Sequence, residues 1–278
     1  MLSAQGFENQ LDQYEILSTL SSTSSNPVSL AVHRTIGIKV AIKSVKTKDY
    51  VRLTMENGVS EAGAMGKFQK NNNTAYLIEE FSHGKLTYIV TKFVKTGDLL
   101  CYLEGLGVDR LSESDARQLF KQIVTGVAEY HSAGIVHRDI KHLNILISIK
   151  SGKPIPKITD FGMAARLSKD QMITKVAGTI SFMAPEIVMD EPSDFKADVW
   201  SLGVMLYALI CSGVPFSGVD RRATGDLIVN KDLSFEKPVW KSVSPSCKDL
   251  IAHMLDKDQV TRLTAQEVLA HPWFSQNQ

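Results

Sequence analysis

The sequence predicts an α+β fold with two lobes, in which a small N-terminal lobe made mainly of strands precedes a larger lobe made mainly of helices. Between Tyr14 and Tyr88, short apolar runs rich in β-branched residues predominate. Beyond residue 97, apolar residues recur at three- and four-residue spacing, which is typical of helices. The length of 278 residues suits one two-lobed unit with a sizeable core.

Three runs carry the strand signal, namely residues 28–32 (VSLAV), 40–43 (VAIK) and 86–90 (LTYIV). One helix is expected to interrupt these strands between Asp49 and Phe68. The Gly and Asp of residues 95–98 (KTGD) mark a turn. The boundary between the lobes is therefore expected near residues 91–97.

In the second lobe, a helix is predicted to begin at residues 112–115 (SESD), because Ser and Asp are typical of helix caps. The apolar stripe that follows has helical spacing and consists of Ala116, Leu119, Phe120, Ile123, Val127 and Tyr130. Further helices are predicted at 197–212, 246–255 and 265–271.

The composition, 44% hydrophobic and 22% charged, is that of an ordinary globular protein. A net charge of +1 gives no reason to expect nucleic acid or an anionic membrane as the main partner. The three cysteines are widely separated, so neither a disulfide framework nor a CxxC metal site is expected. The N-terminus lacks the pattern of a signal peptide, and the longest apolar stretch, 199–211, is too short to cross a bilayer. We therefore expect a cytoplasmic protein, with the nucleus as the alternative.

The most informative segment is residues 137–144 (HRDIKHLN), followed downstream by residues 160–162 (DFG). Phosphoryl transfer needs a carboxylate that orients the acceptor hydroxyl and takes its proton, and side-chain oxygens that hold magnesium against a triphosphate. Asp139 supplies the carboxylate, and Asn144 and Asp160 supply the magnesium ligands. Lys141 can neutralise charge on the migrating phosphoryl group.

Upstream, Lys43 ends the 40–43 run, and a lysine at the end of a strand can reach the α- and β-phosphates. Glu61 is the expected acidic partner of Lys43, with Glu56 as the less favoured alternative. Taken singly, each of these motifs has a plainer interpretation as a surface charge cluster, a turn or a solvated lysine. Their occurrence together and in this order favours the catalytic interpretation.

Two further segments complete the pattern. Residues 178–186 (GTISFMAPE) follow the DFG triplet after a short loop, and residues 198–203 (DVWSLG) open an apolar helix. With these segments the chain resembles the eukaryotic protein kinase family, from about Tyr14 to Phe274. The resemblance implies a two-lobed protein kinase fold whose small lobe has an antiparallel sheet and one main helix. It also implies ATP and Mg²⁺ as cofactors.

The resemblance implies roles for individual residues. Lys43 and Glu61 would form an ion pair, Asp139 would be the catalytic base, and Asn144 and Asp160 would bind Mg²⁺. The boundaries implied are an N-terminal extension at 1–13, a kinase domain at 14–274 and a C-terminal tail at 275–278. Within the domain, the small lobe would span 14–91, the hinge 92–97 and the large lobe 98–274.

An ATP slot is expected between the lobes, with the hinge backbone from Lys92 to Val94 reading adenine. The resemblance implies that its lining consists of Leu20, Ser21, Val28, Ala41, Thr91, Val94 and Leu146. Without the resemblance, each of these residues could as easily be an ordinary core residue. The small Thr91 at the back of the slot predicts that bulky inhibitors of the ATP site are admitted.

Lys141, and Thr179 before the Ala-Pro-Glu triplet, match the serine/threonine branch of the family. The expected acceptors are therefore Ser and Thr hydroxyls of protein substrates. Glu186 and Arg262 resemble the ion pair that the family carries in its large lobe. The C-terminal segment 240–274 resembles the calcium/calmodulin-dependent kinase group, including the calcium-dependent protein kinases.

The loop that covers the nucleotide departs from the family. It normally reads G-x-G-x-x-G, because glycine lets backbone N–H groups approach the phosphates. Here the three glycine positions hold Ser21, Thr23 and Asn26, and Pro27 further restricts Asn26 toward extended conformations. Two hypotheses follow: an active kinase with a raised KM for ATP, or a pseudokinase that binds nucleotide weakly and works as a scaffold or allosteric partner.

We favour the active kinase, because all six chemical positions keep the family residue: Lys43, Glu61, Asp139, Lys141, Asn144 and Asp160. A kinase of small molecules is less favoured, since residues 178–186 resemble a loop that positions a peptide. Asp98 would contact a basic residue before the phosphoacceptor, or would serve only as a turn residue. Because Leu143 stands where basic-directed kinases carry glutamate, only a modest preference for upstream Arg or Lys is expected.

An upstream activating kinase is a possible partner. A phosphate on the activation loop could pair with Arg138 and order the segment. Thr174 is the first candidate site and Ser168 the second. Lys175 occupies the usual phosphosite position, so a loop that orders without phosphate is the alternative.

Overall fold

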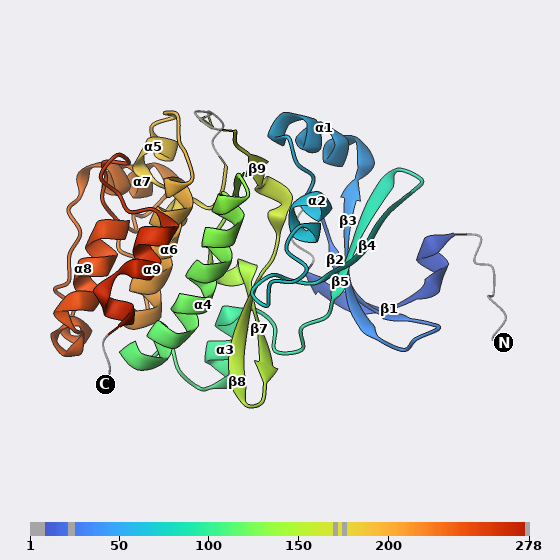
Figure 1. Ribbon diagram of the computed structural model, residues 1–278, viewed down its shortest axis with the longest axis horizontal. Coiled ribbons are helices and arrows are strands. Elements are labelled where there is room, and N and C mark those ends of the chain that lie inside the picture. Colours follow the sequence, from blue (N-terminus) through green and yellow to red (C-terminus); the bar gives the residue numbers. More distant parts are fainter. Residues whose placement is uncertain (1–8, 22–25, 169–171, 174–176, 276–278) are drawn as a thin grey trace.

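The computed structural model describes residues 9–21, 26–168, 172–173 and 177–275, and these form two lobes (Figure 1). The small lobe contains a five-stranded antiparallel sheet with the order β1-β2-β3-β5-β4. Its strands are β1 (Tyr14–Ser21), β2 (Val28–His33), β3 (Lys39–Lys46), β4 (Leu77–His83) and β5 (Leu86–Lys92). The predicted α+β fold with two lobes is confirmed.

Side chains of β3 alternate between the two faces of the sheet, so one face contributes to the core of the small lobe and the other to the candidate site. Val40 and Ile42 are buried in the core of the small lobe with Ala31 and Val90. Because successive side chains of a strand point to opposite faces, Ala41 and the next odd-numbered residue, Lys43, point away from that core. The sequence predicts Lys43 at the end of a strand. It lies in the middle of β3 instead, because the strand continues to Lys46.

The single helix expected between β3 and β4 is two helices, α1 (Thr47–Asn57) and α2 (Glu61–Gly66). Gly58 ends α1 in the left-handed conformation, with a φ of 68°, as helix C-terminal glycines commonly do. Ser60 then starts α2, and its side chain accepts a hydrogen bond from a backbone N–H of the first turn. Glu61 therefore stands at the beginning of a short helix and not within a long one.

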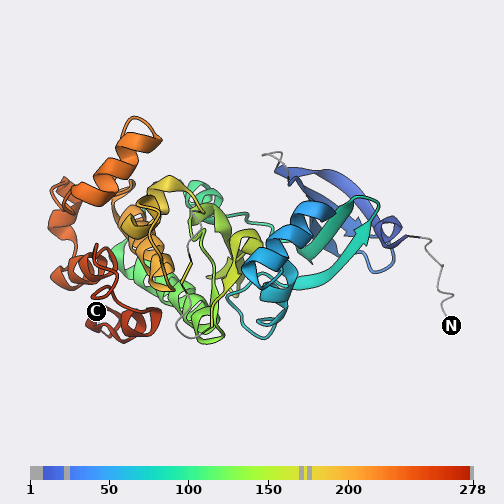
Figure 2. The same cartoon turned by 90° about the horizontal axis from the view of Figure 1, so that it is seen from above.

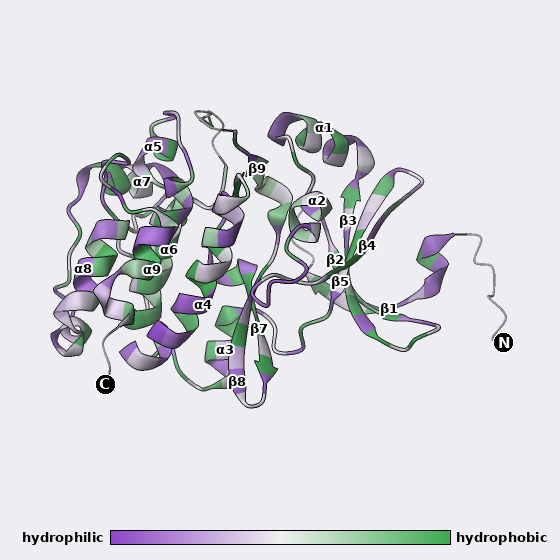
Figure 3. Cartoon of the chain, viewed as in Figure 1, coloured by the Kyte–Doolittle hydropathy of each residue, from purple (hydrophilic) through white to green (hydrophobic). Residues whose placement is uncertain are grey.

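The large lobe is mainly helical, and its helices pack around a common core (Figure 2). The helices are α3 (Leu99–Gly105), α4 (Glu113–Ser132), α5 (Pro185–Val188), α6 (Lys196–Cys211), α7 (Arg221–Asn230), α8 (Pro245–Met254) and α9 (Ala265–Ala270). Most of them carry both hydrophobic and hydrophilic residues in Figure 3, as expected for helices that cover a core. Helix α6 differs, because nearly all of its residues are buried. No helix of the described ranges is long and apolar enough to cross a membrane.

Two small two-stranded sheets lie at the junction of the lobes. β7 (Ile145–Lys150) pairs with β8 (Lys153–Ile158), and β6 (Ile135–Val136) pairs with β9 (Ala165–Arg166). These strands bracket the segments that carry Asp139 and Asp160. Sequence analysis had not predicted them, nor helix α7, whereas α4, α6, α8 and α9 begin within one residue of their predicted starts.

A buried ion pair fastens the large lobe, as the resemblance implied. The Arg262 guanidinium donates to both carboxylate oxygens of Glu186, at 2.7 and 2.8 Å. It also donates to the backbone carbonyl oxygens of Asp256 and Lys196, and it lies over the ring of Trp200 at 5.2 Å from the centroid. Glu186 is thereby held at the end of the 178–186 segment, which faces the catalytic loop.

Candidate active site

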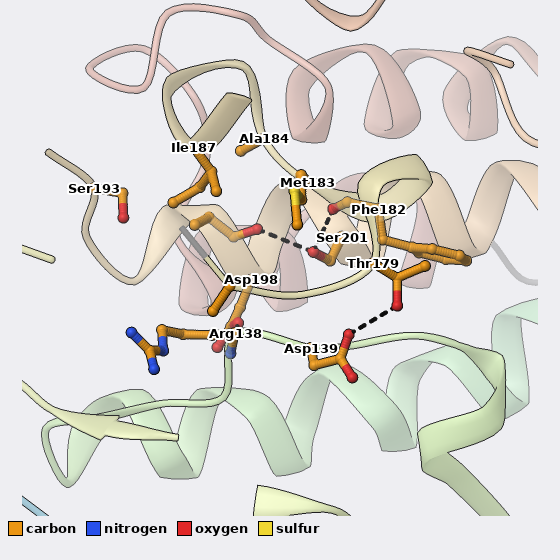
Figure 4. A pocket seen from close by; sticks show the side chains of 12 residues that line it. Arg138, Asp139, Thr179, Phe182, Met183, Ala184, Ile187, Ser193, Asp198 and Ser201 are labelled. Carbon is orange, nitrogen blue, oxygen red and sulfur yellow. Dashed lines mark hydrogen bonds between the residues drawn. The ribbon is translucent and has the colours of Figure 1, made fainter. Parts of the chain in front are cut away.

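The Asp139 carboxylate lies at the centre of a network of three side chains. Lys141 Nζ and Asn144 Nδ2 donate to its Oδ2, at 2.6 and 3.0 Å. The Thr179 hydroxyl donates to its Oδ1 at 3.1 Å (Figure 4). The same hydroxyl accepts from Lys141 Nζ at 2.9 Å. The structure thus brings together three residues of the catalytic loop and one residue of the 178–186 segment.

Gly178 allows the 178–186 segment to approach the loop this closely. Its φ is 109°, a backbone angle that residues with a side chain rarely adopt. A Cβ at this position would lie 2.7 Å from the carbonyl oxygen of Arg138. In the sequence, Gly178 is notable only as the first residue of a motif. Its left-handed conformation and the contact with Arg138 explain why a residue without a side chain stands before Thr179.

Asp198, at the start of α6, anchors the catalytic loop through hydrogen bonds to its backbone. Its carboxylate accepts the backbone N–H groups of His137 and Arg138, both at 2.8 Å, and a ring nitrogen of His131 at 3.0 Å. Burial would raise the pKa of Asp198, but these donors outweigh it and lower the pKa below its usual value. They also stabilise the unusual φ of 69° at Arg138. Sequence analysis assigned no role to Asp198, although an acidic residue opening an apolar helix was a possible signal.

Phe161 locks the DFG triplet against the same loop. Its buried ring lies 4.7 Å from the ring of His137 and 5.0 Å from that of Tyr130. His137 in turn pairs through Nε2 with the carbonyl oxygen of Thr159 at 3.0 Å. Asp160, next to Phe161, adopts a left-handed conformation with a φ of 61°. This turn leaves its side chain 45% exposed and within reach of the small lobe.

Lys43 joins the two lobes across the site. Its Nζ donates to both carboxylate oxygens of Glu61, at 2.9 and 2.8 Å, and to Asp160 Oδ1 at 2.7 Å. Burial alone would lower the pKa of Lys43, but the two carboxylates outweigh it and raise the pKa. Burial would raise the pKa of Asp160, yet Lys43 holds it below its usual value, whereas burial raises the pKa of Glu61 against the opposing charge of Lys43. Of the two candidate partners, Glu61 makes the pair, and Glu56 instead bonds Arg52.

The oxygen atoms expected to bind Mg²⁺ fit that ion. Asn144 uses its Nδ2 to donate to Asp139, so its amide oxygen has no hydrogen-bond partner within the described ranges. Asp160 engages Lys43 through Oδ1, which leaves Oδ2 for a ligand. Carboxylate and amide oxygens are ligands that Mg²⁺ accepts.

Sheet register brings the expected ATP slot together. Ala41 pairs with Thr91 across β3 and β5, and Val28 pairs with Lys43 across β2 and β3. Leu146 forms a β-bridge with Asp98, so it lies beside the end of the hinge. Leu20 is 45% exposed, and the remaining lining residues are partly exposed, as expected for an open slot.

Between Lys92 and Val94, where adenine is expected, one backbone N–H has no hydrogen bond to the described residues. The N–H groups of Lys92 and Phe93 already donate to the carbonyl oxygens of Tyr76 and Lys39. The N–H of Val94 makes no hydrogen bond with any residue that the structure describes. The donor available to a ligand is therefore that of Val94.

Of the three residues at glycine positions, Ser21 ends β1 and pairs with Val28. Asn26 is not among the described residues with positive φ, in agreement with the expected restriction by Pro27. Thr23 lies outside the described residues, as do Thr174 and Lys175 of the activation loop.

Two residues with expected roles in substrate binding and regulation have protein partners. Asp98 caps α3, where its Oδ1 accepts the backbone N–H groups of Leu100 and Cys101. The Arg138 guanidinium donates to the carbonyl oxygen of Met163 at 2.6 Å and to Asn57 Oδ1 at 3.3 Å. Asn57 ends α1, so this contact links the small lobe to the catalytic loop without a phosphate.

A second group of ligand-type side chains, Asp249, His253 and His271, lies together on the large lobe. His271 accepts the backbone N–H of Trp273 through Nδ1 at 3.2 Å, so a neutral ring carries its proton on Nε2. That nitrogen faces Asp249 at 3.0 Å and is then a donor. The arrangement is a hydrogen-bonded pair and does not suit a metal ion.

A family model described as protein kinase domain matches residues 14–274. The chain belongs to the protein kinase family. This kinase domain is 31% identical over 267 residues to a probable myosin light chain kinase of Dictyostelium discoideum, a match that covers 96% of the domain chain and 67% of the relative. It is 40% identical over 187 residues to the serine/threonine-protein kinase PEPKR2 of Arabidopsis thaliana, covering 67% of the chain and 38% of the relative.

A third relative supports the subgroup. The kinase domain is 30% identical over 267 residues to a calcium/calmodulin-dependent protein kinase type 1 of Caenorhabditis briggsae, covering 96% of the chain and 74% of the relative. The resemblance to the calcium/calmodulin-dependent kinase group is therefore confirmed. The chain spans less than half the length of other relatives, such as the Arabidopsis kinase at 38%.

Proposed function

We propose that this chain is a serine/threonine protein kinase that transfers the γ-phosphoryl group of ATP to Ser and Thr hydroxyls of proteins. The observation that carries the proposal is the convergence of two networks. One surrounds the Asp139 carboxylate, and the other joins Lys43 to Glu61 and Asp160. Together they present a base, a charge-neutralising lysine and metal ligands around one space, with family membership behind them.

In this proposal Asp139 orients the acceptor hydroxyl and takes its proton as the oxygen attacks phosphorus. Thr179 and Asn144 fix the rotamer of the carboxylate, and Lys141 stabilises negative charge on the transferred group. Asn144 and Asp160 would hold Mg²⁺, which neutralises charge on the phosphate oxygens. Lys43, kept in place by Glu61, would contact the α- and β-phosphates.

Adenine would lie between the lobes, against the lining residues Leu20, Ser21, Val28, Ala41, Thr91, Val94 and Leu146. The unpaired N–H of Val94 supports this position, and the carbonyl of Lys92 would accept from the base. We retain the proposed boundaries of the small lobe (14–91), hinge (92–97) and large lobe (98–274), flanked by segments 1–13 and 275–278. The cytoplasm, or else the nucleus, is the proposed location.

Radiolabelled phosphate transfer from ATP to a Ser-containing protein or peptide mixture tests the proposal, with Asp139→Asn as the control. At high ATP and Mg²⁺ we expect incorporation that falls by about 10²–10⁴-fold in the variant. Incorporation that does not depend on Asp139 would contradict it. A thermal-shift measurement with ATP and Mg²⁺ distinguishes the kinase from the pseudokinase alternative. Bound ligand at a hundredfold over Kd should stabilise the folded protein by about 2.7 kcal/mol. Absence of a shift would favour the pseudokinase.

The activation loop is the proposed target of an upstream kinase, with Thr174 first and Ser168 second. The two neutral partners of Arg138 support the alternative in which the loop orders without phosphate. The Thr174→Ala variant decides between them in the same transfer assay. A large loss of activity supports phosphorylation at Thr174, and unchanged activity supports ordering without it.

A further inference from the structure

A cavity of about 610 Å³ lies beside the catalytic centre, between the 178–186 segment and helix α7. It adjoins a smaller cavity that is lined by Asp139 and Thr179, and the two share Met183 and Ile187 in their walls. The two cavities are therefore neighbours, and a peptide whose acceptor hydroxyl lies at Asp139 would have the larger cavity beside it. Helix α7 packs against α5 and the turn at Ile180–Phe182, so the walls of the larger cavity are made of elements packed against one another.

The lining of the larger cavity combines an apolar floor with a positive rim. Its floor is made by Ile180, Met183, Ile187, Val188 and Val229. Arg221 and Arg222, the first two residues of α7, are exposed at the rim. Neither arginine pairs with a carboxylate within the described ranges.

Carboxylates near the rim do not neutralise it. Asp226 also lines the cavity, but no ion pair within the described ranges joins it to Arg222, four residues before it. Asp220 does not line the cavity, and it caps α7, where its Oδ1 accepts the N–H of Ala223 at 2.7 Å. Among the residues that line the cavity, two arginines against one carboxylate leave a net positive charge.

We infer that Arg221 and Arg222 select protein substrates with an acidic residue after the phosphoacceptor. The inference rests on the proposed kinase activity and adds a preference that the catalytic residues do not determine. An apolar side chain of the substrate would occupy the floor near Ile180, and an Asp or Glu further along would pair with the guanidinium groups. Arg suits this task because its planar guanidinium binds a carboxylate through two hydrogen bonds.

A peptide series tests the inference. Each peptide carries one Ser, with Glu, Ala or Lys placed in turn at each of the next few positions, and kcat/KM is measured for phosphorylation. The wild type should prefer Glu over Lys by about fivefold at one position at least, the size expected of a partly exposed pair. The Arg221→Glu/Arg222→Glu variant should reverse the preference toward Lys.

A matched control keeps the charge change and moves it away from the cavity. Arg110 and Lys241 are exposed and line neither cavity, so the Arg110→Glu/Lys241→Glu variant should keep the preference for Glu. The Asp226→Asn variant, which removes the lining carboxylate, should strengthen the preference for Glu. Equal rates for Glu and Lys peptides in an active wild type would overturn the inference while leaving the proposed kinase activity intact.

Binding measurements keep the inference testable without any phosphate transfer. Fluorescence anisotropy of labelled Glu and Lys peptides on the wild type should give about fivefold tighter binding for Glu, and the Arg221→Glu/Arg222→Glu variant should reverse it. Equal affinities would overturn the inference. Absence of Asp139-dependent transfer alongside selective binding would instead contradict only the proposed kinase activity.

Discussion

The catalytic loop and the strand hairpin beside Lys43 differ in how their residues are fixed. In the loop, Asp139 is held by three side chains, and Asp198 accepts two backbone N–H groups from below. In the hairpin, Ser21 and Val28 are joined by strand pairing, and Leu20 is 45% exposed. The residues proposed for the chemistry are thus held in place by hydrogen bonds from the protein itself. The hairpin, which holds Ser21 and Asn26 where the family carries glycines, is the part on which we expect nucleotide binding to depend.

The largest effect on the free energy of unfolding is expected at the buried ion pair between Arg262 and Glu186. Arg262→Leu leaves the buried Glu186 carboxylate without its partner and should lower the free energy of unfolding by about 3–5 kcal/mol. Urea unfolding measures it. Arg34→Leu is the control, since its pair with Glu15 is more than half exposed and should be worth less than about 1 kcal/mol. Similar losses in both variants would show that burial of the pair does not decide its contribution.

Gly162 tests the link between the lobes. A Cβ there would lie 3.2 Å from both Lys43 Nζ and Glu61 Oε2 and 3.3 Å from Asp160 Oδ1. Gly162→Ala should therefore displace the ion pairs and lower kcat by about 100-fold, because small misplacements of catalytic groups carry such costs. Gly66→Ala is the matched control, since its Cβ would meet only Leu77 at 3.8 Å. Unchanged kcat in Gly162→Ala would mean that the Lys43 contacts are not needed for transfer.

The lowered pKa of Asp198 makes the stability of the protein depend on pH in the acid range. Its pKa in the folded protein lies below the unfolded value of about 3.9, so its stabilisation is complete above that value and is lost as pH falls through the folded one. Asp198→Asn should cost about 2 kcal/mol near pH 7 and flatten the acid limb of the stability curve. Unfolding midpoints from pH 7 down to pH 3 measure both effects. An acid limb as steep in the variant as in the wild type would contradict this role.

Local patterns were enough for the elements whose signals are local. Ser112 caps α4 as predicted, and the apolar stripe behind it is buried. Helix α7 escaped prediction because its sequence, RRATGDLIVN, has few apolar residues and a central glycine. It is stabilised by packing against α5, which no local pattern reveals. The break between α1 and α2 was within reach, since Gly58 and Ser60 are residues that end and begin helices.

The candidate site was predictable to the extent that its residues belong to ordered motifs. Lys43, Asp139 and Asp160 could be named because their spacing resembles that of a family. Asp198 opens the 198–203 motif, but its role could not be named, because that role arises from contacts with residues some 60 positions earlier in the chain. The same holds for the free N–H of Val94, which follows from the hydrogen bonds its neighbours make elsewhere.

Whether nucleotide binding or chemistry limits this kinase is tested most directly by restoring the glycines. In the Ser21→Gly/Thr23→Gly/Asn26→Gly variant, backbone N–H groups regain access to the phosphates. We predict that the KM for ATP falls about tenfold, as one regained hydrogen bond to a charged group would give, while kcat stays within about twofold. A rise in kcat with an unchanged KM would contradict the view that the machinery around Asp139 is already complete.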